Sequence, residues 1–248
     1  MKTVIRTAAL SILILSAGAA SAVDLRGMLG AGKDLVSAAT LSDKDIVDGS
    51  RSMMKQMDKS ENMAPSSSKH AKRLAKLTSK FKNEDGLKLN FAVYNSPDVN
   101  AFATPDGSIR IHTGLMDLMT DDELLGVIGH EIGHTKLGHS AAQMKKALLL
   151  SAGTQAVGAS GSKVAGLVSA NSETIQAFGK AQFSQSDETA SDDYGFNFMK
   201  KHKYDVKAME SAFRKLAKLD QGGGSSLMAS HPNSASRADR MKAKAEQM

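Results

Sequence analysis

Two histidines and a glutamate lie close together inside an otherwise apolar stretch of this sequence. His130 and His134 are four residues apart, and Glu131 directly follows the first histidine. On an α-helix, residues four apart share a face, so both imidazoles can converge on one metal ion. Glu131 lies one position around the helix, where its carboxylate can reach a water molecule that the metal activates. This H-E-x-x-H arrangement is typical of zinc sites that hydrolyse peptide bonds, with the glutamate as general base.

The stretch around these residues has the features of a helix. The acidic residues Asp121, Asp122 and Glu123 precede it, and acidic side chains stabilise the first turn of a helix through its dipole. Apolar neighbours would bury both imidazoles. A purely structural histidine pair is the alternative interpretation, but the burial of two neutral imidazoles favours a shared metal ion. We therefore predict a metal helix over residues 121–136.

A catalytic zinc ion needs a third protein ligand, and an acidic segment downstream can supply it. The chain contains no cysteine, so this ligand must be His, Asp or Glu. Glu188 and Asp192 are four residues apart and would share a helix face. Glu188 can then bind the metal while Asp192 accepts the distal N–H of a ligating histidine. Asp187 is the alternative ligand, and an exposed acidic helix face is the alternative structure.

Two other histidines in this part of the chain are not expected to bind the metal. His139 follows His130 by nine residues, which would place it on the opposite side of a continuous helix. The metzincin pattern needs a glycine and a histidine where this sequence has Leu137 and Ser140. His112 stands alone in an alternating segment, where a histidine is more often structural. We therefore expect neither His139 nor His112 among the ligands.

Three short segments before the metal helix have the alternating pattern of β-strands. Strands are predicted over residues 87–94, 100–103 and 108–112. The turn residues Pro105-Asp106-Gly107 stand between the last two segments and predict a hairpin. An exposed edge of this small sheet could hold a peptide by strand addition.

The segment before the sheet is predicted to be helical. Residues 24–63 are interpreted as helical segments with a break at Asp48-Gly49-Ser50. Met53, Met54 and Met57 repeat at helical spacing. This pattern favours core packing, with a flexible Met-lined binding surface as the alternative.

The segment after the metal helix is rich in small residues. Residues 140–180 are predicted to form two loosely packed helices around a break at 158–161. Gly, Gln, Ser and Lys163 interrupt the apolar residues too often for a membrane span. The low side-chain bulk makes this segment a candidate mobile cover over the site.

The N-terminus has the pattern of a secretory signal peptide. Lys2 and Arg6 precede an uncharged run that ends at the small residues Ala20-Ser21-Ala22. We predict a signal peptide over residues 1–22 and a single domain over residues 23–248. An uncleaved anchor is the alternative, but the run is short and ends in small residues. Export without a cysteine for lipid attachment predicts a soluble periplasmic or secreted protein.

The charge distribution argues against nucleic-acid binding. The 248-residue chain has a net charge of +6, with basic residues concentrated in residues 69–82 and 200–207. Residues 69–81 alternate basic and apolar side chains and are predicted to form an amphipathic helix. Solvated helix faces explain both clusters, because the chain has three tyrosines, no tryptophan and no nucleic-acid motif. A weak association with an anionic membrane surface remains open, as does the oligomeric state.

Several motifs of the chain occur together in the order found in one metallopeptidase family. They are Asn100–Ala103, Gly107, Gly114-Leu115, Asp122–Leu124, His130–His134, Glu188 with Asp192, and His231-Pro232 with Arg237. Through them the sequence resembles the HtpX/CAAX-prenyl-protease type of zinc metallopeptidase, a gluzincin family, and in particular its soluble branch in the bacterial envelope. The resemblance covers residues 40–245 and is far more specific than H-E-x-x-H alone.

The resemblance implies a fold and a metal site. The fold is α+β and mainly α-helical, a zincin-like metallopeptidase domain with a small β-sheet beside the active-site helix. His130, His134 and Glu188 would hold one Zn²⁺ per chain, and Glu131 would act as base and proton shuttle.

The resemblance also implies roles for residues that the pattern alone leaves unassigned. His231 would approach the site and help to stabilise the developing oxyanion, and Arg237 would support its loop. Taken alone, His231 is only a histidine beside a proline in a Gly/Ser-rich region. Asn100 and Phe102, in the segment that can form a sheet edge, would contact the substrate.

The expected function is zinc-dependent hydrolysis of peptide bonds in unfolded or damaged envelope proteins, a form of protein quality control. The alternative is a zinc-stabilised protein, latent or chaperone-like, that binds client polypeptides and rarely cleaves them. Both functions have unfolded or misfolded polypeptides as partners.

Overall fold

The computed structural model describes residues 42–152, 172–220 and 226–248. These residues form a mainly helical structure with two small sheets, which confirms the predicted α+β class. The predicted signal peptide over residues 1–22 and the predicted break at residues 158–161 lie outside the described residues.

The helix that carries the H-E-x-x-H motif is α5, Asp121–Lys136, and it confirms the predicted metal helix. A capping box fixes its start: Thr120 Oγ1 accepts from the Glu123 amide, and Glu123 Oε2 accepts from the Thr120 amide at 2.7 Å. Every residue from Glu123 to His134 is buried. The motif therefore lies inside the protein, on a helix whose first turn is pinned by its own sequence.

A three-stranded sheet lies beside α5. Its strands are β3 (Asn90–Tyr94), β4 (Ala101–Ala103) and β5 (Ser108–His112), in the order β3-β5-β4. β4 and β5 are antiparallel and form the predicted hairpin, which turns at Gly107 with φ of +86°. β3 instead runs parallel to β5. Within the described residues β4 is an edge strand with β5 as its partner, so its outer edge can accept another strand.

The strand predicted over residues 87–94 is divided in two. β1 (Asn83–Glu84) and β2 (Leu87–Lys88) form a separate antiparallel pair. Leu89, between β2 and β3, donates its amide hydrogen to the carbonyl of Lys82 rather than to the three-stranded sheet. The tight turn at Asp85-Gly86 folds β2 back onto β1, and the following residues are then free to pair with β5.

The break predicted at residues 48–50 is wrong, because helix α2 runs without interruption from Asp43 to Ser60. Gly49 and Ser50 are buried, and Ser50 Oγ lies 3.2 Å from Asp106 Oδ1 in the β4–β5 turn. These small residues therefore allow α2 to approach the hairpin closely. Met53 and Met54 are at most 2% exposed and pack in a hydrophobic cluster, which confirms the core-packing interpretation for these two residues.

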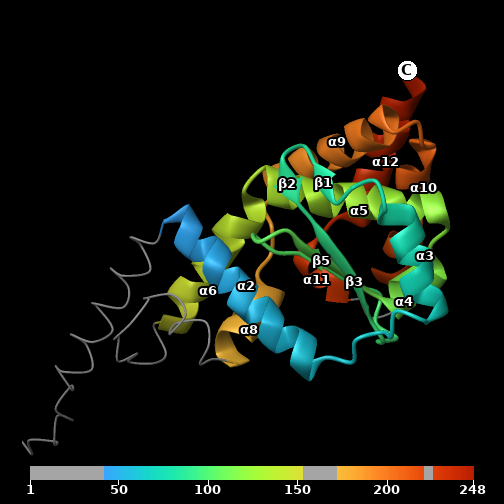
Figure 1. Cartoon of the computed structure of the whole chain (residues 1–248). Helices are drawn as coiled ribbons and strands as arrows, with labels where there is room; N and C mark the ends of the chain where they lie inside the picture. The colour runs from blue at the N-terminus through green and yellow to red at the C-terminus, as the bar shows by residue number, and fades with distance from the viewer. Residues whose placement is uncertain (1–41, 153–171, 221–225) are drawn as a thin grey trace, which may run out of the picture.

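The other helices surround α5 and the sheet. They are α3 (Lys69–Thr78), α4 (Thr113–Leu118), α6 (His139–Ala152), α8 (Ser172–Lys180), α9 (Gln185–Lys201), α10 (Lys207–Asp220), α11 (Ser226–Ser230) and α12 (Ser234–Glu246). Side chains from the sheet, α5, α9, α10 and α12 form the main hydrophobic core. A second hydrophobic cluster joins α2, α6 and α8, which lie together on the left in Figure 1.

Buried charges tie α2 to the sheet. The Arg110 side chain, only 4% exposed on β5, pairs with Asp58 near the end of α2 through Nη2–Oδ2 at 2.8 Å. Tyr94 on β3 donates its hydroxyl hydrogen to the same carboxylate at 2.7 Å. Because Asp58 lies in the last turn of α2, these contacts fix the C-terminal end of that helix against the strands.

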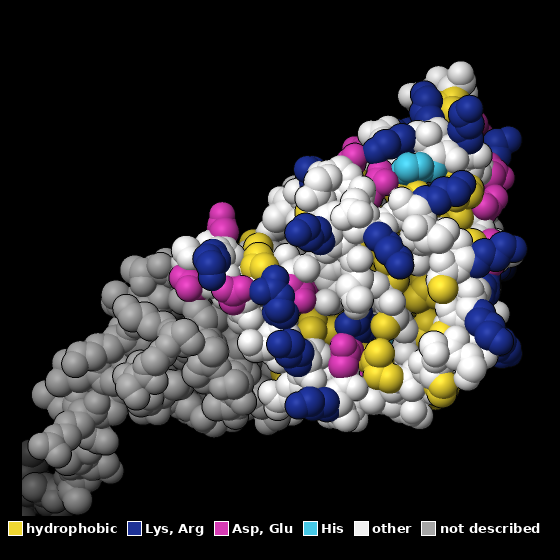
Figure 2. All heavy atoms as spheres, in the orientation of Figure 1, with side chains coloured by type: hydrophobic (Ala, Val, Ile, Leu, Met, Phe, Trp, Pro, Cys, Tyr) yellow, Lys and Arg dark blue, Asp and Glu magenta, His cyan; other side chains and the backbone are white. Residues whose placement is uncertain are grey.

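The lysines of α3 are solvated, as predicted, whereas Arg73 is half-buried and donates to the carbonyls of Met116 and Met119. Lys69, Lys72 and Lys76 are exposed, whereas Leu74 of the same helix is buried in the main core. Figure 2 shows lysine and arginine side chains dispersed over the visible face rather than gathered into one patch. In the described part of the chain, no helix combines the length and apolar character that crossing a membrane requires.

Helices α5 and α9 approach each other closely because glycines line their contact. A Cβ atom built on Gly129 would lie 2.7 Å from Phe198 Cδ1 and 3.2 Å from the Cα of Gly195. A Cβ on Gly133 would lie 3.1 Å from the Cα of Ser191. The two backbones are therefore nearer than side chains would allow, and this brings the acidic face of α9 to the histidines of α5.

We expect Gly129→Ala to destabilise the protein by about 1–3 kcal/mol, because the added methyl group must displace Phe198 or separate the two helices. Urea denaturation of parent and variant measures this difference. Gly179→Ala is the control, since its Cβ would meet no atom within 4 Å and alanine favours a helix. Equal stability of Gly129→Ala and the parent would contradict the tight contact.

Candidate metal centre

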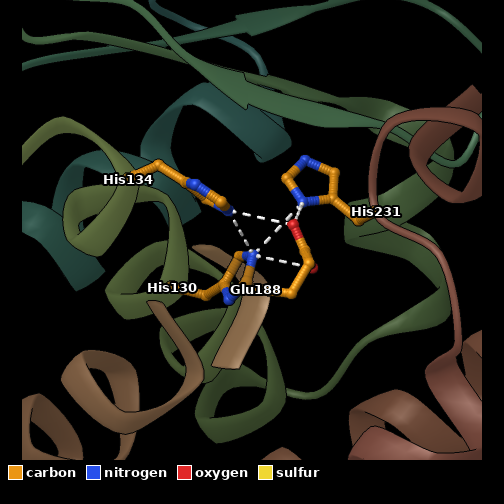
Figure 3. Close-up of side chains that lie close together, drawn as sticks. All are labelled: His130, His134, Glu188 and His231. Carbon is orange, nitrogen blue, oxygen red and sulfur yellow. Dashed lines mark hydrogen bonds and ion pairs between the residues drawn. The ribbon is translucent and has the colours of Figure 1, made fainter. Parts of the chain in front are cut away.

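Four buried side chains from three parts of the chain meet at one point. His130 and His134 come from α5, Glu188 from α9, and His231 from the turn between α11 and α12 (Figure 3). Each offers one ligand atom, and these atoms all lie within 4.8 Å of one another. The structure thus brings together the three predicted ligands, His130, His134 and Glu188. It also places His231 beside them, as the family resemblance implies.

The distances within this cluster fit a metal ion. His134 Nε2 lies 2.9 Å from His130 Nε2 and 3.3 Å from Glu188 Oε1. His231 Nδ1 lies 2.9 Å from Glu188 Oε1 and 3.2 Å from His130 Nε2. A tetrahedral ion with ligand distances of about 2.0–2.1 Å would separate its donors by about 3.3 Å. These nitrogen and oxygen atoms are therefore close enough together to bind one divalent ion.

Asp192 and Arg237 hold the ligands from behind. Asp192 Oδ1 lies 2.9 Å from His130 Nδ1, so this nitrogen can donate its hydrogen there and leave Nε2 free to bind an ion. The Arg237 guanidinium pairs with Asp192 through Nη2–Oδ1 at 2.6 Å and with Glu188 through Nη1–Oε2 at 2.5 Å. One arginine thus orients the carboxylate that can bind the ion and the carboxylate that orients His130.

The electrostatic environment favours the protonation states that metal ligands need. Burial opposes the ionisation of Glu188, but the neighbouring imidazoles of His231 and His130 hold its pKa well below the usual range. Burial, reinforced by His130, lowers the pKa of His134 well below its ordinary value. Burial also opposes the ionisation of Asp192, and the Arg237 guanidinium outweighs it and lowers the pKa of that carboxyl. Anionic carboxylates and a neutral imidazole are the forms that bind divalent metals.

Glu131 lies next to the cluster without belonging to it. Its side chain is buried, and Oε1 has no hydrogen-bond partner among the described residues. His231 Nε2 lies 3.7 Å from Oε1, beyond hydrogen-bond distance. A buried carboxylate oxygen without a partner is unfavourable unless a ligand or water satisfies it. The free Oε1 of Glu131 can therefore accept a hydrogen bond from a water molecule, as a general base must.

A cavity of about 280 Å³ opens beside Glu131 and His231. The two predicted substrate-binding residues, Asn100 and Phe102, line it, and Phe102 belongs to the edge strand β4. The same cavity is therefore lined by Glu131, the predicted general base, and by Phe102 of the edge strand β4.

His139 lies closer to the cluster than the helix geometry suggested. Helix α5 ends at Lys136, and Gly138 turns the chain with φ of +80°, so the assumption of a continuous helix was wrong. His139 Nδ1 lies 3.2 Å from His134 Nδ1, and His139 Nε2 lies 3.5 Å from Asp187 Oδ1. Neither His139 nor Asp187 belongs to the cluster of four ligand atoms. His139 can orient the ring of His134, and Asp187 contacts His139.

Two phenylalanines that sequence reasoning did not identify complete the surroundings. The ring of Phe183 stacks on His134 with a centroid distance of 3.8 Å. Phe213 lies under the Arg237 guanidinium, 4.2 Å from its central carbon. The position of Phe183 directly before the N-cap residue Ser184 of α9 was the one available signal. Phe213 shows no signal in the sequence, because it lies on α10, which carries no motif.

Comparison with known proteins agrees with this geometry. The model of peptidase family M48 matches residues 66–245. The chain is 37% identical over 231 residues to metalloprotease LoiP of Escherichia coli (strain K12), which covers 89% of this chain and 90% of LoiP. It is also 37% identical over 223 residues to metalloprotease YcaL of the same organism, covering 89% of this chain and 87% of YcaL. Shorter matches include a protease HtpX of Alkalilimnicola ehrlichii, 41% identical over 64 residues, covering 24% of this chain and 21% of that protein. The chain therefore belongs to peptidase family M48, and it is a metalloprotease.

Proposed function

We propose that this protein is a zinc-dependent endopeptidase that cleaves unfolded or damaged proteins of the cell envelope. The observation that carries the proposal is the convergence of the ligand atoms of His130, His134 and Glu188 beside a buried Glu131 whose Oε1 is free. The family implies a divalent metal, and a donor set of imidazoles and a carboxylate without thiolate suits zinc.

In this proposal, each residue has a defined chemical role. His130, His134 and Glu188 hold the ion, and Asp192 fixes the ring of His130. When bound, zinc polarises the scissile carbonyl and lowers the pKa of the attacking water. Glu131 accepts the proton from that water and returns it to the leaving amine.

His231 and the strand edge act on the substrate. His231 lines the cavity beside Glu131, so its imidazole can donate a hydrogen bond to the carbonyl oxygen as negative charge develops. Asn100 and Phe102 stand at the β4 edge, which can pair with an extended peptide. A peptide must be extended to pair in this way, so unfolded segments are the substrates that the site favours.

The N-terminal sequence supports the proposed cellular location. The signal peptide predicted over residues 1–22 would direct the protein to the periplasm. An oxidising compartment places no constraint on a chain without thiols. Misfolded envelope polypeptides are then the available substrates, in agreement with a quality-control function.

We expect Glu131→Gln to lower the rate of casein cleavage by about 10²–10⁴-fold, because the amide cannot accept the proton from water. Its zinc content should remain at one ion per chain, since Glu131 is not among the ligand atoms. Glu188→Ala is the contrast, and it should lose both zinc and activity. Metal analysis after dialysis and a casein digest measure the two properties. If Glu131→Gln cut casein as fast as the parent, the mechanism would be wrong.

We expect Asp192→Asn to weaken zinc binding by about 10–100-fold, because an amide holds the His130 ring in the required orientation less well. Competition with a zinc chelator measures this affinity without reference to activity. The matched control is Asp193→Asn on the same helix, whose carboxylate pairs with Arg240 and Lys244 outside the cluster. An unchanged zinc affinity in Asp192→Asn would remove this residue from the site.

A second candidate function is a latent or client-binding form of the same protein. It is favoured by His231 Nδ1, which occupies the fourth corner of the donor set, 2.9 Å from Glu188 Oε1 and 3.2 Å from His130 Nε2. A histidine at this corner would compete with water for the ion and hold the site closed until a substrate displaces it.

The variant His231→Ala separates the two candidates. The endopeptidase with His231 as oxyanion donor predicts slower casein cleavage, by about 10-fold or more, because a hydrogen bond to the transition state is lost. The latent form predicts faster cleavage, because the fourth position becomes free. Initial rates with zinc-loaded protein decide between them, and equal zinc content in both proteins is the control.

A further inference from the structure

The cavity beside Glu131 combines apolar walls with an acidic rim. Met57 from α2, Tyr94 from β3 and Phe102 from β4 contribute apolar surface. Glu61, which follows the end of α2, and Asp98, in the turn between β3 and β4, line the same cavity, and both are exposed. The cavity therefore offers apolar contact along its walls and negative charge where it opens to solvent.

No lysine or arginine of the described residues balances these carboxylates. The chain as a whole carries 32 Lys and Arg against 26 Asp and Glu, yet no Lys or Arg of the described residues lines this cavity. Among the described residues, neither Glu61 nor Asp98 forms a salt bridge, whereas Asp48 and Asp58 of α2 do. The cavity is thus an acidic depression in a basic protein, and a cation from outside would meet two unpaired carboxylates.

His112 adds an unsatisfied polar atom to the same region. It lines the cavity from the end of β5, and its buried Nδ1 has no hydrogen-bond partner in the part of the chain that the structure describes. Burial lowers the pKa of His112 against the opposing effect of Asp98 and Glu61, so the ring stays neutral near pH 7. A neutral imidazole does not cancel the negative charge of the rim, and it can accept a hydrogen bond from a cationic group.

The cavity is part of the proposed reaction site, because Glu131 lines it. Glu131 is 1% exposed, and its Oε1 has no hydrogen-bond partner among the described residues. It lines the same cavity as Glu61 and Asp98. A side chain bound between the apolar walls and the acidic rim would therefore belong to a residue close to the scissile bond.

We propose that this cavity is a specificity subsite for lysine or arginine, so that the protein cleaves polypeptides next to basic residues. The inference rests on the proposed endopeptidase function and specifies its substrate class. Lysine and arginine combine an apolar stem with a cationic head, which matches apolar walls that end in carboxylates. The stem packs against Met57, Tyr94 and Phe102, while the head pairs with Glu61 and Asp98.

Other side chains match this cavity less well. A large apolar residue would fill the walls but gain nothing from the rim. An acidic residue would be repelled by Glu61 and Asp98. The preference should therefore decrease in the order basic, apolar, acidic.

The first test compares peptides that differ at one residue. Cleavage sites of the zinc-loaded protein are mapped on casein, and Lys or Arg should be enriched at one position within three residues of the cut. A quenched peptide based on the main site is then made with lysine or norleucine at that position, since norleucine keeps the stem and lacks the charge. We expect kcat/KM to be about tenfold higher for the lysine peptide, as expected of two partly exposed ion pairs.

The second test removes the acidic rim. Glu61→Gln/Asp98→Asn should cleave the lysine and norleucine peptides at similar rates, because the lysine head no longer meets a carboxylate. The matched control is Asp117→Asn/Glu246→Gln, which removes two exposed charges from α4 and α12, outside the cavity. This control should keep the lysine preference of the parent. A preference that survives in the rim variant, or that disappears in the control, would overturn the assignment to Glu61 and Asp98.

A binding measurement separates this inference from the proposed function. Glu131→Gln is titrated with the same two peptides carrying a fluorophore, and anisotropy gives each Kd. We expect about tenfold tighter binding of the lysine peptide, weakening as ionic strength rises because the carboxylates are partly exposed. Tighter lysine binding without cleavage by the parent would leave the subsite in place and overturn the endopeptidase. Cleavage with equal binding of both peptides would overturn the subsite and leave the endopeptidase in place.

Discussion

The whole site depends on how closely α5 and α9 approach each other. Gly129 and Gly133 of α5 face Gly195 and Ser191 of α9, where a larger residue would meet backbone atoms within about 3.1–3.2 Å. This separation allows a carboxylate of α9 to reach the same point as two imidazoles of α5. The capping boxes that start both helices fix their registers. Helix geometry alone therefore sets most of the donor set before any metal binds.

Buried charge is the second constraint, because isolated carboxylates are unstable inside a protein. Arg237 compensates Glu188 and Asp192 together, and Phe213 packs against its guanidinium. This arrangement lets two anions remain ionised beside three imidazoles. A lysine could not make the same set of contacts, since it lacks the planar fork that reaches two carboxylates at once. The arginine thus acts as an internal counter-ion that keeps the cluster assembled.

Much of this could be predicted from sequence, for identifiable reasons. The four-residue spacing of His130 with His134, and of Glu188 with Asp192, indicated two shared helix faces, and those helices are present. The approach of His231 came only from family resemblance, because no local pattern links a turn histidine to a distant helix. The helix assumed to continue through His139 ends at a positive-φ glycine, Gly138, whose turn the spacing rule ignored. The parallel pairing of β3 with β5 and the stacking of Phe183 depend on contacts between distant segments, which periodicity does not report.

The two hydrophobic clusters hold different parts of the site in place. The ligand helices α5 and α9 pack in the main core, whereas α2 packs mainly with α6 and α8 and is fastened to the sheet by Asp58 and Arg110. One wall of the cavity is therefore built on a helix, α2, that contributes none of the four clustered ligand atoms. Mutations in α2 can alter which polypeptides enter while the hydrolytic groups keep their geometry. Because the two are separate, substrate selectivity can change during evolution while the protein keeps its hydrolytic activity.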